Sequence, residues 1–399
     1  NAAEANILGV LLKRSAKKFV LTLARRLFMG LVVLGSVLTL FFAIAPHGRA
    51  ALQTGFFVLQ VLDIPVKPQP WLTGDPVREE VFYPRPGSTG VADVYRVMDG
   101  EPRAAVLLFL GANAAGRDDK DVVKLGNALA RAGFVAMFHW SPTMALQHNI
   151  DPAERENLVW AFQYLAAQDF VDPERVGLGG FCVGASFSLV AAADPRIRDK
   201  VRFVNAFGPY FDAEELLLQI ASRSKIENGQ RVPWDPDPLT LEVFANELID
   251  TLVDKNDIAL LTRLHLNGGR SAPGELEQLS PEGQAVNRLL QGTTWEEAEL
   301  LYDRLPAAFR RDMRTISPNN YVDDISARLM ILHDRDDRLV PAAESRRLAV
   351  AFEDRGDILY TEVLEFDHVR PDSGGGVWQF IKEGAKLYRH MYSIMRTAS

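Results

Sequence analysis

Short apolar runs that alternate with helical patterns are the feature that most restricts the fold of this chain. Residues 104–110 (AAVLLFL) form a continuous apolar run, as is typical of a strand covered on both faces. Residues 119–132 then show the apolar spacing of a helix, and residues 134–138 predict the next strand. The alternation continues to residue 211 and resumes after residue 316. It predicts an α/β fold, with helices on both faces of a mostly parallel sheet.

The alternation is interrupted between residues 212 and 316, which contain several helical stretches and no clear strand. A helical segment of this length between two strands predicts a cap over the sheet. The expected core therefore comprises residues 77–211 and 317–399, and the expected helical cap insertion comprises residues 212–316.

The N-terminal region predicts a membrane anchor. Residues 27–45 carry no charged side chain and are just long enough, at about 1.5 Å per residue, to cross a hydrocarbon core of about 30 Å. Basic residues between positions 13 and 26 precede this run, so the positive-inside rule predicts a single pass with a cytoplasmic N-terminus and an extracytoplasmic catalytic domain. A cleaved signal peptide is the alternative, although Pro46 would follow the cleavage site.

Two segments are therefore expected before the core. Residues 1–46 comprise a cytoplasmic amphipathic segment and the transmembrane helix. Residues 47–76 comprise a membrane-proximal segment and a proline-rich linker, because Pro65, Pro68 and Pro70 stiffen this stretch.

Charge and cysteine content exclude several classes of function. The chain has 44 basic and 52 acidic residues, a net charge of −8, so no overall basic field indicates nucleic-acid binding. Cys182 is the only cysteine, which excludes an intrachain disulfide and a multi-cysteine metal site. The seven histidines are scattered, and neither a metal nor a cofactor is expected.

Residues 180–184 (Gly-Phe-Cys-Val-Gly) lie between a predicted strand and a predicted helix. A nucleophile elbow needs this pattern, because its central residue occupies a strained turn and the residues two positions away must be small. The Cys182 side chain would stand above the sheet at a helix N-terminus, where the helix dipole is expected to lower the thiol pKa. A buried structural thiol is the alternative.

Two possible partners for Cys182 follow it in the chain. Residues 332–341 (LHDRDDRLVP) come directly after one predicted strand, and His368 comes after the next. The order nucleophile, acid, histidine is the one that an α/β-hydrolase topology imposes.

Because of these residues, this chain resembles the α/β-hydrolases over the range from about Val77 to Arg396. Its cysteine elbow is similar to that of dienelactone hydrolases. The acid loop resembles the family pattern H-G-x-x-D-x-x-V-P, with Asp334 where glycine is usual. The resemblance implies that Asp337 is the triad acid, with Asp336 as the alternative, and that His368 is the histidine.

The same resemblance implies an oxyanion hole. One donor would be the backbone N–H of Val183, directly after the nucleophile. The other would be the N–H of Ala112, in the loop after the 104–110 strand, because Leu110-Gly111-Ala112 aligns with the family's H-G-x motif.

The implied function is a membrane-anchored hydrolase that cleaves a carboxylic ester, lactone or thioester through a Cys-His-Asp triad and an acyl-thioester intermediate. Its expected partners are a small-molecule ester or lipid-like substrate, the membrane and a membrane protein complex, without nucleic acid. Acyl transfer to an alcohol stays open. The alternative is a catalytically degenerate hydrolase fold that serves as a binding or assembly subunit of a membrane complex.

Overall fold

The computed structural model describes residues 29, 32–33, 35–36, 41–42, 44–61, 67–112, 116–364 and 376–398, with only the backbone of residues 376–381 and 398. The chain divides into two units, residues 1–53 with residue 399, and residues 54–398. The fold described below is that of the second unit.

The prediction of a transmembrane helix is corrected. No helix within the described part of the chain is long and apolar enough to span a membrane. Most of the predicted span, residues 27–45, lies outside the described residues. The helix described next to it is α2 (Pro46–Val61), whose 16 residues include arginine, glutamine and threonine. At about 1.5 Å per residue α2 is shorter than a hydrocarbon core of about 30 Å. The predicted orientation stays untested.

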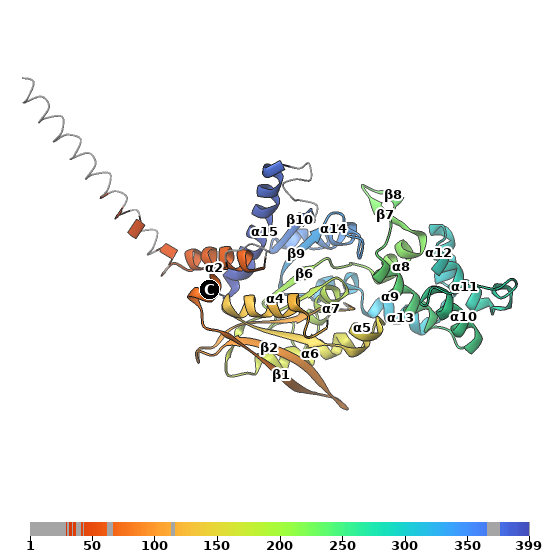
Figure 1. The fold of residues 1–399 in the computed structure, drawn as a ribbon, viewed down its shortest axis with the longest axis horizontal. Helices are drawn as coiled ribbons and strands as arrows, with labels where there is room; N and C mark the ends of the chain where they lie inside the picture. Colours follow the sequence, from red (N-terminus) through yellow and green to blue (C-terminus); the bar gives the residue numbers. More distant parts are fainter. Residues whose placement is uncertain are drawn as a thin grey trace, which may run out of the picture. The chain divides into compact units, whose positions relative to one another are not determined.

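The core contains an eight-stranded sheet (Figure 1). Its strands, in spatial order, are β1 (Pro76–Arg85), β2 (Ser88–Val97), β4 (Phe134–Trp140), β3 (Arg103–Phe109), β5 (Val171–Phe181), β6 (Phe203–Phe207), β9 (Arg328–Asp334) and β10 (Ile358–Val363). Strand β2 is antiparallel to both neighbours, and the strands from β4 to β10 are parallel. The predicted mostly parallel sheet is confirmed, and its carboxyl strand ends share one edge.

Helices cover both faces of the sheet. The helices of the core are α3 (Gln69–Leu72), α4 (Lys120–Arg131), α5 (Pro142–Gln147), α6 (Glu154–Ala166), α7 (Val183–Ala192), α14 (Ala342–Ala351) and α15 (Gly376–Ala398), with 3₁₀ turns η2 (Pro318–Asp324) and η3 (Glu353–Arg355). Side chains of α6 and α7 join one hydrophobic cluster with Val204 and Ala206 of β6. Between these two residues, Asn205 accepts a hydrogen bond on the opposite face from His390 of α15. Alternate residues of a strand point to opposite faces, so α7 and α15 lie on different sides.

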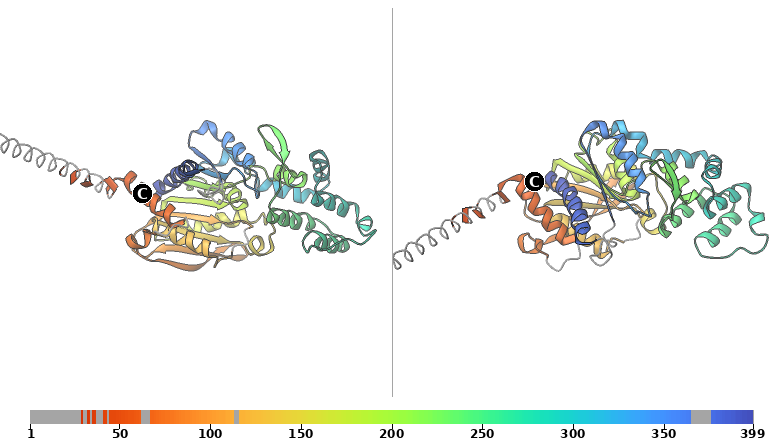
Figure 2. Two further views of the ribbon diagram at one scale, coloured as in Figure 1. Left: turned by 45° about the horizontal axis from the view of Figure 1, so that its top comes forward. Right: turned by 90° about the horizontal axis from the view of Figure 1, so that it is seen from above.

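The insertion between β6 and β9 forms a helical cap at one end of the sheet (Figures 1 and 2). It contains α8 (Ala213–Ser222), α9 (Pro238–Ile249), α10 (Lys255–His265), η1 (Leu276–Gln278), α11 (Pro281–Gln291), α12 (Trp295–Tyr302) and α13 (Ala307–Thr315). The expectation that this segment contains no strand was wrong. A hairpin, β7 (Ser224–Glu227) and β8 (Gln230–Pro233), turns at Asn228-Gly229, where both φ angles are positive, at 51° and 76°. Asn-Gly is a strong signal for such a turn.

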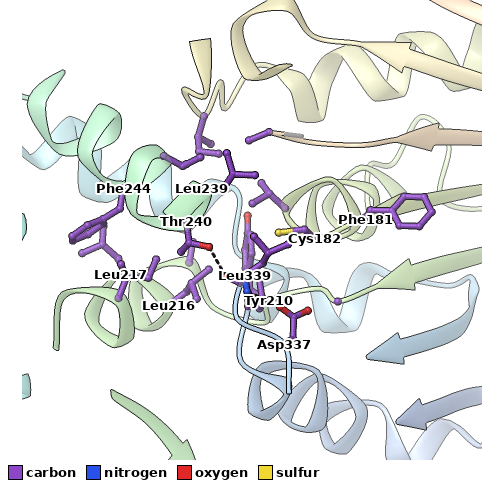
Figure 3. Close-up of a pocket in the computed structure, with 18 of the residues that line it drawn as sticks. Phe181, Cys182, Tyr210, Leu216, Leu217, Leu239, Thr240, Phe244, Asp337 and Leu339 are labelled. Atoms are coloured by element: carbon purple, nitrogen blue, oxygen red, sulfur yellow. Dashed lines mark hydrogen bonds between the residues drawn. The ribbon is translucent and has the colours of Figure 1, made fainter. Parts of the chain in front are cut away.

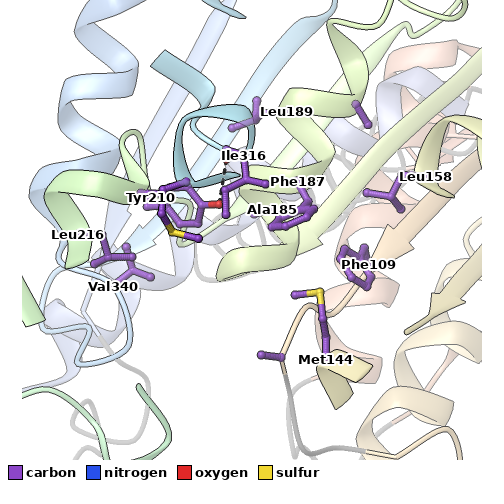
Figure 4. Packing of buried hydrophobic residues seen from close by; sticks show 14 of the residues in the cluster. Phe109, Met144, Leu158, Ala185, Phe187, Leu189, Tyr210, Leu216, Ile316 and Val340 are labelled. Atoms are coloured by element: carbon purple, nitrogen blue, oxygen red, sulfur yellow. Dashed lines mark hydrogen bonds between the residues drawn. The ribbon is translucent and has the colours of Figure 1, made fainter. Parts of the chain in front are cut away.

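The cap shares its hydrophobic interior with the core (Figure 4). One cluster of buried side chains includes Phe109 of the sheet, Phe187 of α7, Leu216 of α8 and Leu289 of α11. A buried polar contact adds to this packing, because the carboxylate of Glu344 on α14 accepts hydrogen bonds from the two backbone N–H groups that precede α8. These contacts fix the start of the cap against the core.

Candidate active site

Cys182 occupies a tight turn between β5 and α7, at the position of the predicted nucleophile elbow. Its φ and ψ angles are 51° and −125°, which is strained for a residue that is not glycine. The turn is held by a hydrogen bond of 2.7 Å from the Cys182 N–H to the carbonyl oxygen of Phe207. The pattern in the sequence therefore produces the local geometry that a nucleophile elbow requires.

The two glycines around Cys182 are required by close backbone contacts. A Cβ atom at Gly180 would lie 2.4 Å from the carbonyl oxygen of Gly184, and one at Gly184 would lie 2.3 Å from the carbonyl oxygen of Phe109. The loop after β3 approaches equally closely, because a Cβ atom at Gly111 would lie 2.6 Å from the Gly184 nitrogen. Any larger residue at these positions would move the elbow.

Cys182 is half-buried as a residue and lies in the wall of a cavity. Figure 3 shows its sulfur pointing towards the cap. Burial raises the pKa of the Cys182 thiol to about 12, and the negative charge of Asp337 adds to this rise. The Val183 N–H at the start of α7 opposes it. The expectation that the helix N-terminus lowers the thiol pKa was thus wrong. Among the described residues, the effect of burial is larger than the opposing effect of the helix N-terminus.

The acid turn after β9 brings Asp337 to the same cavity. One carboxylate oxygen of Asp337, Oδ1, accepts hydrogen bonds from the N–H groups of Leu339 at 2.6 Å and Val340 at 3.0 Å. Its other oxygen lies 3.4 Å from Nε2 of His333. Asp336, the alternative acid, is exposed and does not line the cavity. The structure therefore brings Asp337, and not Asp336, to the cavity that contains Cys182.

His333 supports the acid turn from inside the core. Its side chain is buried, with Nδ1 2.6 Å from the hydroxyl of Ser345 and Nε2 2.9 Å from the carbonyl oxygen of Val340. With Nε2–H donating to Val340, the imidazole holds the turn that positions Asp337.

His368, the predicted histidine, lies outside the described residues, which omit 365–375. Strand β10 ends at Val363, which itself lines the cavity. The chain thus reaches the cavity five positions before His368.

Both predicted oxyanion donors belong to residues of the cavity wall. Val183 is the first residue of α7, where a backbone N–H has no acceptor within the helix. Ala112 follows β3 and lies in the same wall. The structure therefore groups Cys182, Val183, Ala112 and Asp337 around one space.

The cavity has a volume of about 490 Å³ and is bounded by the carboxyl edge of the sheet and by the cap helices α8, α9 and α13. Its lining is mainly apolar, and the cap contributes Leu216, Leu217, Leu239, Phe244, Phe309 and Met313, among others. Such a volume fits a small molecule that is largely apolar.

Tyr210 and Glu247 are among the polar residues of the cavity that were not predicted from the sequence. Tyr210 donates its hydroxyl to the carbonyl oxygen of Ile316 at 2.9 Å, so it links the core to the end of the cap. Glu247 of α9 lines the cavity, and its carboxylate accepts a hydrogen bond from the N–H of Ile150. Neither residue belongs to a motif, and a helical pattern does not indicate which side chains of a cap face a cavity.

Ser186 is the hydroxyl closest in sequence to the elbow, and its environment is structural. It is fully buried, and its hydroxyl bonds to the N–H and the carbonyl oxygen of Tyr210 at 2.9 and 3.0 Å. It is absent from the cavity lining, so Cys182 remains the candidate nucleophile of this elbow.

Comparisons with known proteins give distant structural similarity. No family model and no curated protein matches the chain. Among solved structures, it is similar to an acylaminoacyl peptidase from Pyrococcus horikoshii (12% identity, 80% of this chain, 41% of the peptidase, TM-score 0.45). It is also similar to a puromycin-hydrolyzing peptidase from Mycobacterium tuberculosis (15% identity, 83% of this chain, 39% of the peptidase, TM-score 0.45). A third similar structure is an esterase from Pyrobaculum calidifontis (14% identity, 91% of this chain, 97% of the esterase, TM-score 0.45).

The chain spans about two fifths of the length of the two peptidases. These similarities do not test the predicted dienelactone-hydrolase-like cysteine elbow. The fold assignment rests on the chain itself: a mostly parallel sheet, an elbow between β5 and α7, and an acid turn after β9. These features make it an α/β-hydrolase fold with a helical cap.

Proposed function

We propose that this chain is a hydrolase with a cysteine nucleophile, which cleaves a carboxylic ester, lactone or thioester through Cys182, His368 and Asp337. The observation that supports this most is the position of Cys182. Its thiol projects from a strained elbow into a mainly apolar cavity whose wall also contains Asp337.

In the first half of the reaction, His368 accepts the proton of the Cys182 thiol while the sulfur attacks the substrate carbonyl carbon. The negative charge on the carbonyl oxygen is stabilised by the N–H groups of Val183 and Ala112, each of which contributes about 3 kcal/mol in comparable sites. The C–O or C–S bond to the leaving group then breaks. The leaving group takes the proton from His368, and the acyl group remains on sulfur as a thioester.

In the second half, His368 accepts a proton from water, and the resulting hydroxide attacks the thioester carbonyl. The C–S bond breaks, the sulfur recovers the proton, and a carboxylic acid leaves. Asp337 keeps the imidazole in the required tautomer and stabilises its positive charge in both halves.

The raised thiol pKa defines the role of the histidine. A thiol with a pKa of about 12 is protonated at neutral pH, so the attack requires a base that acts during bond formation. His368 is proposed as that base.

The test is hydrolysis of p-nitrophenyl esters of increasing acyl length by the full chain, with intact mass spectrometry for an acyl adduct. We expect turnover and an adduct in the parent protein, and neither in Cys182→Ala. Because Cys182 is the only cysteine, any thiol-linked adduct reports on this residue alone. Turnover that persists in Cys182→Ala would contradict the proposal.

A binding protein without turnover is the second candidate, because a mainly apolar cavity of about 490 Å³ can bind a ligand without any reaction. If the protein only binds a ligand, the cavity should bind apolar ligands equally well in the parent protein and in Cys182→Ala. Iodoacetamide labelling separates the two functions: a working triad gives labelling at neutral pH that falls in His368→Ala. An inert thiol in both proteins would support the binding function.

A further inference from the structure

Glu247 is a carboxyl group in the part of the cavity wall that the cap provides. It is carried by α9, and one of its oxygens accepts the N–H of Ile150. No ion pair joins it to a cation within the described residues. An ionised carboxyl group in an apolar wall costs free energy, and the Ile150 N–H offsets only part of that cost, so a cationic group on a ligand would stabilise it further.

The charges around the cavity are of one sign. Its described lining includes three carboxyl groups, those of Asp334, Asp337 and Glu247, and none of the described lining residues is lysine, arginine or histidine. Asp337 is held by the backbone of its own turn, whereas Glu247 lies on the opposite, cap side. When Glu247 is ionised, the field at the cap end of the cavity favours a ligand with positive charge.

Without a bound cation, burial opposes the ionisation of Glu247. Burial raises its pKa to about 8, the Asp250 and Asp151 carboxylates add to the rise, and the Ile150 N–H opposes it. Tyr210 lines the same cavity, and its own pKa is raised by burial and by the charges of Cys182, Asp212 and Glu247. A cation beside Glu247 would reverse the rise, because it stabilises the carboxylate.

We propose that Glu247 is a specificity-determining residue that binds a basic nitrogen at the cap end of the ligand. The ligand is then an apolar chain with an amine at one end and, where the proposed function holds, a scissile carbonyl at the other. The turnover part of this inference rests on the proposed hydrolase function, and the binding part does not.

Substitutions can distinguish a purely structural role of Glu247 from a role in binding a cation. Glu247→Gln keeps a side-chain oxygen that can accept the Ile150 N–H, but it removes the negative charge. Glu242 is the matched control on the same helix, because it is exposed, pairs with His148 and is absent from the cavity lining. Glu247→Asp is a second variant that keeps the charge if the glutamine variant folds poorly.

The binding test uses heptylamine and heptan-1-ol, which share a chain and differ in charge. Calorimetric titration of the full-length Cys182→Ala protein at pH 8 should show tighter binding of heptylamine. Glu247→Gln in that background should weaken heptylamine binding about tenfold and leave heptan-1-ol unchanged, since one charge-assisted hydrogen bond is lost. Glu242→Gln should change neither, and Glu247→Asp should keep part of the preference.

The turnover test compares p-nitrophenyl 6-aminohexanoate with p-nitrophenyl heptanoate. The ratio of their kcat/KM values should fall about tenfold in Glu247→Gln and stay constant in Glu242→Gln. Selective amine binding without hydrolysis of either ester would support the inference and contradict the proposed function. Hydrolysis with an unchanged ratio would overturn the inference alone. Equal affinity for the amine and the alcohol, or no binding of either, would also overturn it.

Discussion

The two walls of the cavity are built in different ways. The core wall consists of turns at the carboxyl edge of the sheet, where backbone contacts place Cys182, Asp337 and Ala112. The cap wall consists of helix faces, and its side chains, among them Phe244 and Glu247, contact the cavity without special backbone geometry. We infer that the first wall determines which bond can be broken, whereas the second determines which molecule fits.

The largest expected effect concerns the acid of the core wall. Asp337→Asn should lower kcat by about 10³- to 10⁴-fold, because the imidazole loses the carboxylate that holds its tautomer. Asp336→Asn should leave kcat within about twofold, since Asp336 is exposed and outside the cavity. Steady-state hydrolysis of p-nitrophenyl butyrate measures both. Equal losses in the two variants would show that the acid turn is wrongly assigned.

A second prediction tests the backbone of the elbow. Gly184→Ala should lower the free energy of unfolding by about 3–4 kcal/mol, because its Cβ atom would lie 2.3 Å from a backbone oxygen. Gly384→Ala in α15 is the matched control, since a Cβ atom there meets nothing within 4 Å. It should stabilise the protein by about 0.5–1 kcal/mol. Urea unfolding compares them, and similar values would mean that the elbow is not tightly packed.

A third prediction concerns pH and the side of the sheet away from α7. His390 is buried between Asn205 and Thr361, and burial lowers its pKa from 6.5 to about 4. The unfolded chain therefore binds the proton more readily. Stability should fall as the pH decreases from about 6.5 towards 4, by at most about 3 kcal/mol. Urea unfolding of the parent and of His390→Gln across this range tests it. In the variant, the free energy of unfolding should depend much less on pH in this range. An unchanged dependence would mean that groups other than His390 cause it.

The smallest expected effect concerns the shape of the cap wall. Phe244→Ala should cost about 2 kcal/mol of stability and enlarge the cavity. Preference should move to longer acyl chains, by about fourfold in kcat/KM for each additional buried methylene. Leu300→Ala is the control, because Leu300 of α12 is exposed and outside the cavity. A p-nitrophenyl ester series measures the shift, and its absence would assign the length preference to the core wall.

The same contrast explains what could be predicted from the sequence. The elbow was visible because Gly180 and Gly184 are required sterically, so the chemistry leaves a pattern of residue types. Asp337 was implied only by the resemblance to the family's acid-loop pattern, with Asp336 as the alternative, and in the structure it caps its own backbone two and three positions later. The steric constraint at the elbow acts over few residues, and a sequence displays it directly.

The cap wall was not visible, for a physical reason. Helix α8 agrees with the predicted helical character of residues 212–316, but the apolar face of a cap helix packs on neighbours as well as on the cavity. Helical spacing does not separate these roles, so Glu247 could not be distinguished from other acidic residues. The Asn228-Gly229 hairpin, in contrast, had a recognisable signal in the sequence.

The hydrophobic cluster that joins sheet and cap has a consequence for cooperativity. Because Leu216, Leu289 and Phe187 belong to one buried cluster, the cap shares its folding free energy with the sheet. The two parts should melt in a single transition, and excision of the insertion would expose apolar core surface. The cap is thus an integral part of the folding unit, and transplanting it to another scaffold would require transplanting its contacts with the sheet as well.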